Sequence, residues 1–279
     1  MTEKTVDGDF DLIIEPHRTT ADFIRELIHY RELFFFLAWR DIIVRYKQTA
    51  IGIVWSLIRP LLSMVIFTLV FGRVAKLPSE GVPYPILVYS AMLPWQYFSS
   101  ALGTSAASLL NGGALVSKIY FPRLILPAAS ILLNAVDFLI SFGLLCVLML
   151  CYRFIPSPMI ILLPLFFLPA TLAALGLGCW FSALSVKYRD FQFVVPFMLQ
   201  FGLFISPVGF SSSIIPERLR LLYSLNPMVG VIDGFRWCIQ GTTVLYLPAV
   251  FLSIVISLLV FLSGIWFFRR IERSFADFI

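Results

Sequence analysis

Residues 154–186 read FIPSPMIILLPLFFLPATLAALGLGCWFSALSV, and none of these side chains carries a charge. An α-helix needs about 20 apolar residues to cross the ~30 Å hydrocarbon layer of a membrane. This stretch exceeds that length. It therefore predicts a membrane-spanning helix. For the rest of the chain we use the same criterion and look for intervals between charged residues that are long enough to span a membrane.

Similar intervals occur on both sides of this stretch. No residue between Glu80 and Lys118 is charged, and Asp137 alone is charged between Arg123 and Arg153. Taken together, the intervals predict an all-α, polytopic membrane protein with six transmembrane helices. We expect these helices within residues Ile51–Gly72, Pro85–Ala107, 124–152, Phe154–Val186, Phe191–Phe210 and Leu245–Phe268.

The composition of the whole chain agrees with this prediction. Of its 279 residues, 59% are apolar and 13% are charged, whereas a soluble domain has about 45–50% and about 25%. The shortage of charge excludes a soluble enzyme, and the 28 Phe residues exclude a disordered chain. The shortage of charge also excludes a nucleic-acid-binding protein, in spite of the net charge of +5. Most of the surface must face lipid.

An even number of spans places both termini on one side of the membrane. Lys and Arg residues in short loops mark the cytoplasmic side, and most of the 21 Lys and Arg residues fall on the side of the N-terminus. We therefore expect both termini in the cytoplasm. Residues 1–50 would form a cytoplasmic N-terminal segment, and residues 51–279 would form the transmembrane domain.

Residues Leu33–Lys47 do not fit a plain alternation of spans and loops. Large apolar side chains recur there on one helical face, and charged residues occupy the other. Such a helix is typically found in the plane of the membrane surface. The alternative is a soluble helix packed on its own protein, which the size of the apolar face disfavours. This face comprises Phe35, Phe36, Trp39, Ile42, Ile43 and Tyr46.

Residues Ser211–Val244 form the second exception. This segment is moderately apolar, but Pro216, Pro227 and several Gly residues divide it into fragments too short to cross a membrane. An ordinary surface loop would expose many Leu and aromatic side chains to water. We therefore predict a re-entrant helical hairpin between the fifth and sixth spans, dipping into the outer leaflet.

Few residues are candidates for binding a nucleotide or a metal ion, or for carrying a proton. The chain has no GxxxxGK[ST] phosphate-binding loop. Its two His residues, His17 and His29, lack neighbours at metal-ligand spacing, so we expect no metal site and no cofactor bound by this chain. Asp137 lies near the centre of a span. It is either a structural hydrogen-bond partner of a neighbouring helix or the coupling group of an ion-driven carrier, and a lone carboxylate favours the structural role.

Several motifs, in collinear order, resemble the ABC-2-type polysaccharide export permeases. RYKQTAIGIVWSLIRPLL at residues 45–62 looks like the opening of that family. YREL at residues 30–33, followed by WRD at residues 39–41, is most similar to O-antigen exporters, with teichoic-acid and capsule exporters close behind. Asp233 stands where Glu is expected more often. The other matching motifs are VFGR (70–73), LPWQYFS (93–99), KIYFPR (118–123), YRD (188–190), SPV (206–208), LNPM (225–228) and FRW (235–237).

The resemblance implies the transmembrane permease of an ATP-driven exporter that moves a lipid-linked, O-antigen-like polysaccharide across the bacterial inner membrane. It also implies a homodimer of this chain with two copies of a separate ABC ATPase. That partner would bind ATP and Mg, so this chain would not itself be an enzyme. From the residues alone, two alternatives stay open: a membrane scaffold or assembly subunit without its own substrate, and an ion-coupled secondary carrier.

Three groups of site candidates follow. Arg59, the one charge within the first span, is a candidate for binding the diphosphate head group, although an anchor to lipid phosphate is the alternative role. Aromatic rings provide faces along which a sugar chain can slide, and the channel candidates are Trp55, Trp95, Tyr97, Phe98, Phe197 and Phe201. The candidates for coupling to the ATPase are Trp39, Arg40, Arg45, Lys118, Tyr120, Arg123, Lys187, Arg189 and Asp190.

Overall fold

A computed structural model describes residues 20–47, 52–116, 118–241 and 245–272. Every regular element in these ranges is a helix, which confirms the predicted all-α class. Each of the six predicted spans overlaps one helix of 15 residues or more. These helices are α3 (Gly52–Phe67, continued by the π-helix η1, Thr68–Val74), α4 (Tyr84–Asn111), α6 (Ile125–Cys151), α7 (Leu163–Lys187), α8 (Phe191–Ile205) and α11 (Leu247–Glu272).

Further helices lie before and between these six. Two of them, α1 and α2, precede the first span, and α9 and α10 lie between α8 and α11. The further helices are α1 (Thr20–His29), α2 (Arg31–Lys47), α5 (Gly113–Val116), η2 (Pro158–Leu162), η3 (Ser212–Ile214), α9 (Glu217–Tyr223) and α10 (Pro227–Gln240).

By length and composition, four of the described helices can cross a membrane: Leu57–Val74, Ile125–Cys151, Pro158–Lys187 and Leu247–Glu272. The other two predicted spans do not meet this standard for different reasons. Helix α8 has only 15 residues. Helix α4 has 28 residues but carries Ser, Thr and Gln side chains along its length. Because α4 is packed among neighbouring helices, it does not need a uniformly apolar surface.

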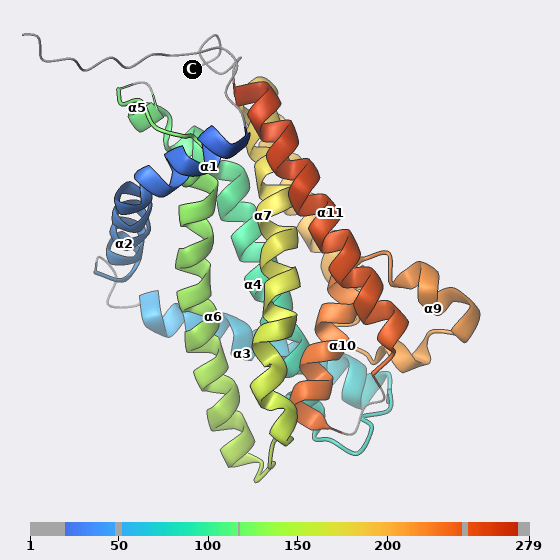
Figure 1. The fold of residues 1–279 in the computed structure, drawn as a ribbon. Helices are drawn as coiled ribbons and strands as arrows, with labels where there is room; N and C mark the ends of the chain where they lie inside the picture. Colours follow the sequence, from blue (N-terminus) through green and yellow to red (C-terminus); the bar gives the residue numbers. More distant parts are fainter. Residues whose placement is uncertain (1–19, 48–51, 117, 242–244, 273–279) are drawn as a thin grey trace, which may run out of the picture.

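Helix α7 lies at the centre of the bundle, between α4 and α11, while α6 packs on another side of α4 (Figure 1). Small residues permit the close packing of α7. Ala170, Ala174, Gly178 and Ser182, spaced four apart, are all buried. A Cβ built on Gly178 would lie 2.2 Å from Ser105 Oγ of α4, so the two backbones approach closely there.

Buried side chains form two clusters. The larger one fills the space among α4, α6, α7 and α10. The smaller one joins the buried face of α2 to the ends of the long helices, and it includes Leu37, Phe121, Val186 and Phe268. Apolar side chains are also exposed on the outer sides of the long helices, among them Leu69, Leu139, Phe193, Phe251 and Leu262. These outer sides suit contact with lipid or with another membrane helix.

The last short helix, α10, has clear local signals at both ends. Asn226 caps its first turn, because its side-chain oxygen accepts a hydrogen bond from the backbone N–H of Met228 at 3.0 Å. Pro227 occupies the first helical position. Gly241 ends the helix with a φ of 69°, a left-handed conformation that favours glycine.

The loops gather at two opposite ends of the bundle. One end holds α1, α5 and the last turns of α7 and α11, and we call it the α1 end (Figure 1). There the backbone N–H of Arg123 donates to Glu272 Oε1 at 3.0 Å, which joins the loop after α5 to the end of α11. At the opposite end the backbone N–H of Ser157 donates to the carbonyl of Ile239 at 3.0 Å, and this contact joins α10 to the α6–α7 connection.

Candidate functional site

Helix α2 has one face packed on the protein and another that is apolar and exposed. Leu37 and Ala38 are buried, in the cluster shared with Phe121 and Phe268. Phe35, Phe36, Trp39 and Ile43 are exposed, each by 37% or more. The predicted apolar face is therefore largely free of protein contacts. Tyr46 departs from it, because its side chain is half-buried and turns toward α6.

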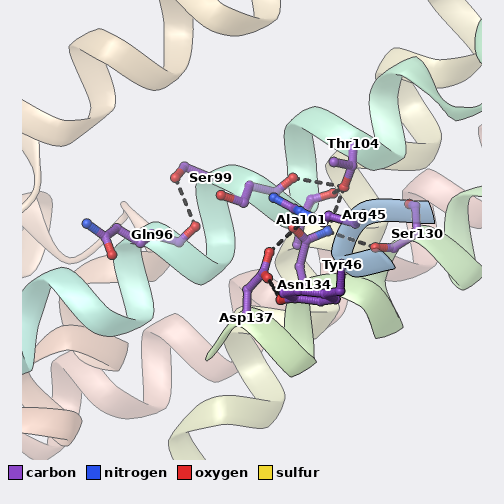
Figure 2. A network of polar contacts seen from close by, with 10 residues as sticks. Arg45, Tyr46, Gln96, Ser99, Ala101, Thr104, Ser130, Asn134 and Asp137 are labelled. Atoms are coloured by element: carbon purple, nitrogen blue, oxygen red, sulfur yellow. Dashed lines mark hydrogen bonds and ion pairs between the residues drawn. The ribbon is translucent and has the colours of Figure 1, made fainter. Parts of the chain in front are cut away.

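The C-terminal turn of α2 is joined to α6 through one carboxylate. Arg45 Nη1 lies 2.8 Å from Asp137 Oδ2, and the Tyr46 hydroxyl donates to Asp137 Oδ1 (Figure 2). Burial, together with the hydrogen bond to Asp137, raises the pKa of Tyr46. The phenol therefore stays protonated and remains a donor. Both oxygens of Asp137 are engaged, which agrees with the predicted structural role and disfavours a proton-carrying one.

Asn134, one turn before Asp137, continues the polar contacts toward α4. Its Nδ2 donates to Thr104 Oγ1 of α4 and to the carbonyl of Ser130, both at 2.7 Å (Figure 2). The Thr104 hydroxyl in turn donates to the carbonyl of Ser100 at 2.9 Å. Polar side chains thus connect α2, α6 and α4 at one level of the bundle.

The other charges of α2 are arranged differently from the sequence pattern. The four-residue spacing of Asp41 and Arg45 favours a pair within the helix. Instead, Arg40 Nη2 lies 2.7 Å from Asp41 Oδ1. Arg45 is directed to Asp137 because that carboxylate, on a packed neighbouring helix, is the more shielded partner: its side chain is 19% exposed, against 29% for Asp41.

The remaining candidates for ATPase coupling lie at the α1 end. Lys118 and Tyr120 are exposed on the loop between α5 and α6. Lys187, Arg189 and Asp190 are exposed on the turn between α7 and α8, where Lys187 Nζ lies 5.3 Å from the centre of the Tyr188 ring. The structure therefore brings the two predicted loops to the same end of the bundle as α1.

The candidate channel aromatics divide into two groups. Trp95, Tyr97 and Phe98 are at most 6% exposed and belong to the larger buried cluster, so in this chain they are core residues rather than exposed ring faces. Phe197 and Phe201 of α8 are exposed, with ring centres 4.5 Å apart. The channel candidates with accessible rings are therefore on α8. Trp55 lies in α3, outside the described side chains.

Arg59 lies in α3 and its side chain is exposed. It immediately precedes Pro60, which is inside the same helix and is buried. Its position on an outer surface is compatible with contact to an anionic head group and equally with an anchoring contact to lipid phosphate.

One prominent charged group had no role in the sequence prediction. Arg236 of α10 is 1% exposed. Its guanidinium donates to the carbonyls of Phe210 at 2.7 Å, Val208 at 3.1 Å and Leu87 at 3.4 Å. One turn earlier, Asp233 Oδ2 accepts from Ser212 Oγ at 2.6 Å. These bonds hold residues 208–212 against α10 and α4. The sequence signal was the FRW motif itself, which places Arg236 one turn after Asp233 in a helix that is otherwise mostly apolar.

The chain is similar to known proteins over most of its length. Residues 32–239 match the family model described as ABC-2 type transporter. The O-antigen export system permease protein RfbA of Myxococcus xanthus is 30% identical over 76% of this chain and 82% of its own length. RfbA of Klebsiella pneumoniae is 24% identical over 86% of this chain and 92% of its own. The capsule polysaccharide export inner-membrane protein CtrC of Neisseria meningitidis is 24% identical over 93% of this chain and 98% of its own length.

Proposed function

Because this chain belongs to the ABC-2 type transporter family, we propose that it is the transmembrane permease of an ATP-driven exporter of lipid-linked polysaccharide. The observation that carries the proposal is the similarity to O-antigen and capsule export permeases over most of both chains. The substrate class follows from the names of these relatives. An O-antigen-like polymer is the preferred cargo, since two of the three relatives are O-antigen export permeases.

ATP hydrolysis is assigned to a separate subunit. The sequence contains no GxxxxGK[ST] loop with which to hold the phosphates of ATP. We propose two ABC ATPase copies, which bind ATP and Mg, on a homodimer of this chain. Their docking surface is the α1 end, where the loop between α5 and α6 meets the turn after α7. This assignment also places the α1 end in the cytoplasm of a bacterial cell.

The proposed topology has six spans and a re-entrant hairpin. Two features support it. Helix α4 is long enough to cross the membrane within the bundle, and the short helices α9 and α10 lie between α8 and α11. In this scheme helix α2 begins at the inner membrane surface and its last turn reaches down to Asp137 in α6, with Phe35, Phe36 and Trp39 in lipid. Both termini are then cytoplasmic.

Cysteine labelling tests the topology. Single cysteines at Ser213 and Arg218, both exposed, should react with a membrane-impermeant maleimide added to intact cells, because the hairpin does not cross the membrane. A cysteine at Asn111, exposed at the α1 end, should react only after permeabilisation. The background is the chain with all four native cysteines replaced. Labelling of Ser213 or Arg218 only after permeabilisation would require a different number of spans.

Arg59 is proposed to bind the diphosphate of the lipid carrier. A guanidinium can form two parallel hydrogen bonds to phosphate, which the ammonium of lysine cannot. Arg59→Lys should therefore reduce the substrate-dependent part of the ATPase activity of the reconstituted complex about threefold or more. Arg73→Lys, at an exposed position near the other end of the same helical segment, is the matched control. Equal stimulation in the two variants would leave Arg59 as a membrane anchor.

Deleting the gene in its own host tests the export function. We expect the complete lipid-linked polysaccharide to accumulate in the cytoplasmic leaflet, because synthesis continues while transport stops. A scaffold or assembly subunit predicts instead that the polymer is not made or not completed. An ion-coupled carrier predicts that a proton uncoupler stops transport at constant ATP, whereas the proposed exporter should continue.

A further inference from the structure

A carboxylate inside a membrane protein is costly unless it is paired, so its partners indicate its task. Asp137 lies about 18 Å along α6 from the first residue of that helix, at 1.5 Å per residue. Its partners, Arg45 and Tyr46, are consecutive residues in the last turn of α2. Two donors on adjacent residues fix both the position and the rotation of that turn. An apolar contact, such as that of Leu37, does not have this directionality.

The contacts do not end at α6. Asn134 is fully buried and lies one turn from Asp137, and it donates to Thr104 Oγ1 of α4. Helix α4 packs in turn against α7, the centre of the bundle. A displacement of α2 is therefore opposed by the contacts of Asp137 on α6. One turn before Asp137, the hydrogen bond from Asn134 to Thr104 connects α6 to α4. Figure 2 shows Arg45, Tyr46, Asp137 and Asn134 gathered in one place, with Thr104 and Ser130 beside them.

We propose that Asp137 is a positioning residue for transport, and that with Arg45 and Tyr46 it forms a latch that makes α2 move together with α6 and α4. The inference rests on the proposed function, in which the first turns of α2 lie at the cytoplasmic surface beside the ATPase. A motion delivered to α2 then reaches two long helices at once. Without the latch, α2 slides or rotates on its apolar contacts, and ATP is hydrolysed without productive transport.

The test measures polysaccharide moved per ATP hydrolysed by the complete complex in proteoliposomes. Asp137→Asn keeps an acceptor for Tyr46 but removes the ion pair, and we expect the ratio to fall about threefold. Asp137→Leu removes both contacts and should lower it about tenfold or more. Asp41→Asn is the matched control, since it also removes a carboxylate paired with an arginine, but at an intrahelical pair on α2. Its ratio should equal that of the wild type.

An exchanged pair keeps the proposal testable if Asp137→Leu does not fold. The double variant Arg45→Asp, Asp137→Arg restores a pair of opposite charges, so it should recover at least half of the ratio lost in Asp137→Asn. A merely structural role would lower the yield or melting temperature of the complex while each surviving complex kept the normal ratio. That result in Asp137→Asn and the exchanged pair would overturn the latch. If the wild-type complex moved no polysaccharide at all, the proposed function would fail instead.

Discussion

Replacing Gly176 by Leu is expected to abolish the accumulation of folded protein. A Cβ at Gly176 would lie 2.6 Å from both the Cα of Phe261 and the carbonyl oxygen of Val260 on α11. These are backbone atoms that no side-chain rotation can move. Helices α7 and α11 would have to separate along their contact, and an ordinary domain has only about 5–15 kcal/mol of total stability with which to tolerate such a loss.

The yield of monodisperse protein after detergent extraction measures this effect. We expect a drop of about tenfold or more for Gly176→Leu. Gly264 faces Gly176 across the same contact, with its Cβ position 2.2 Å from the Gly176 carbonyl oxygen, so Gly264→Leu should behave alike. Gly143 of α6 has no atom within 4 Å of its Cβ position, and Gly143→Leu should leave the yield near that of the wild type. Normal yields for all three would contradict the packing of α7 on α11.

The second large effect is expected at Arg236. Arg236→Met removes the guanidinium that donates hydrogen bonds to the carbonyls of Phe210, Val208 and Leu87, so these carbonyls lose this donor. Breaking one partner out of a buried charged network costs about 3–5 kcal/mol. We expect the melting temperature of the detergent-solubilised protein to fall by about 10 °C.

Arg218 provides the comparison for Arg236. It is exposed on α9, and a surface substitution away from such a network changes stability by about 0.5 kcal/mol or less. Arg218→Met should therefore melt within about 1–2 °C of the wild type. If the two Met variants melted together, Arg236 would not hold residues 208–212 in place.

The long helices could be predicted because charges mark where they end. Lys187, for example, closes both the predicted fourth span and α7. The start of that span was less accurate: α7 begins at Leu163 instead of Phe154, after the 3-10 turn of η2. Pro156 and Pro158 explain the difference, because each lacks a backbone N–H and disfavours a helical conformation in the preceding residue.

Contacts between distant residues could not be predicted in the same way. Asp137 was expected to bond to a neighbouring helix, but nothing in a single sequence connects it to Arg45, which is 92 positions earlier. Helical periodicity also does not say which neighbour covers a face. Trp95 and Phe98 are aromatic, as a channel lining would be, yet they pack in the core because α4 is surrounded by other helices.

The contacts of buried polar residues could not be predicted from the sequence either. Arg236 is flanked by Phe235 and Trp237, and no role for it was predicted from the sequence beyond its place in the FRW motif. Its role depends on three carbonyls that come from the segment after α8 and from α4. Such a site exists only once the helices are assembled, so the composition of α10 alone does not reveal it.

We propose that this chain forms the path along which an ABC ATPase moves a lipid-linked polysaccharide. The most direct test of this proposal is a reconstitution of the chain and its ATPase in liposomes with the ATPase outside and the labelled glycolipid in the outer leaflet. We expect ATP to make the label inaccessible to an added glycosidase, because the glycolipid is moved into the liposome. This protection should be lost when the chain is omitted or when the phosphate-binding lysine of the ATPase is replaced. ATP-dependent protection without this chain would show that another component forms the path. ATP hydrolysis by the complete complex with the label still fully accessible would show that the complex does not move the polysaccharide.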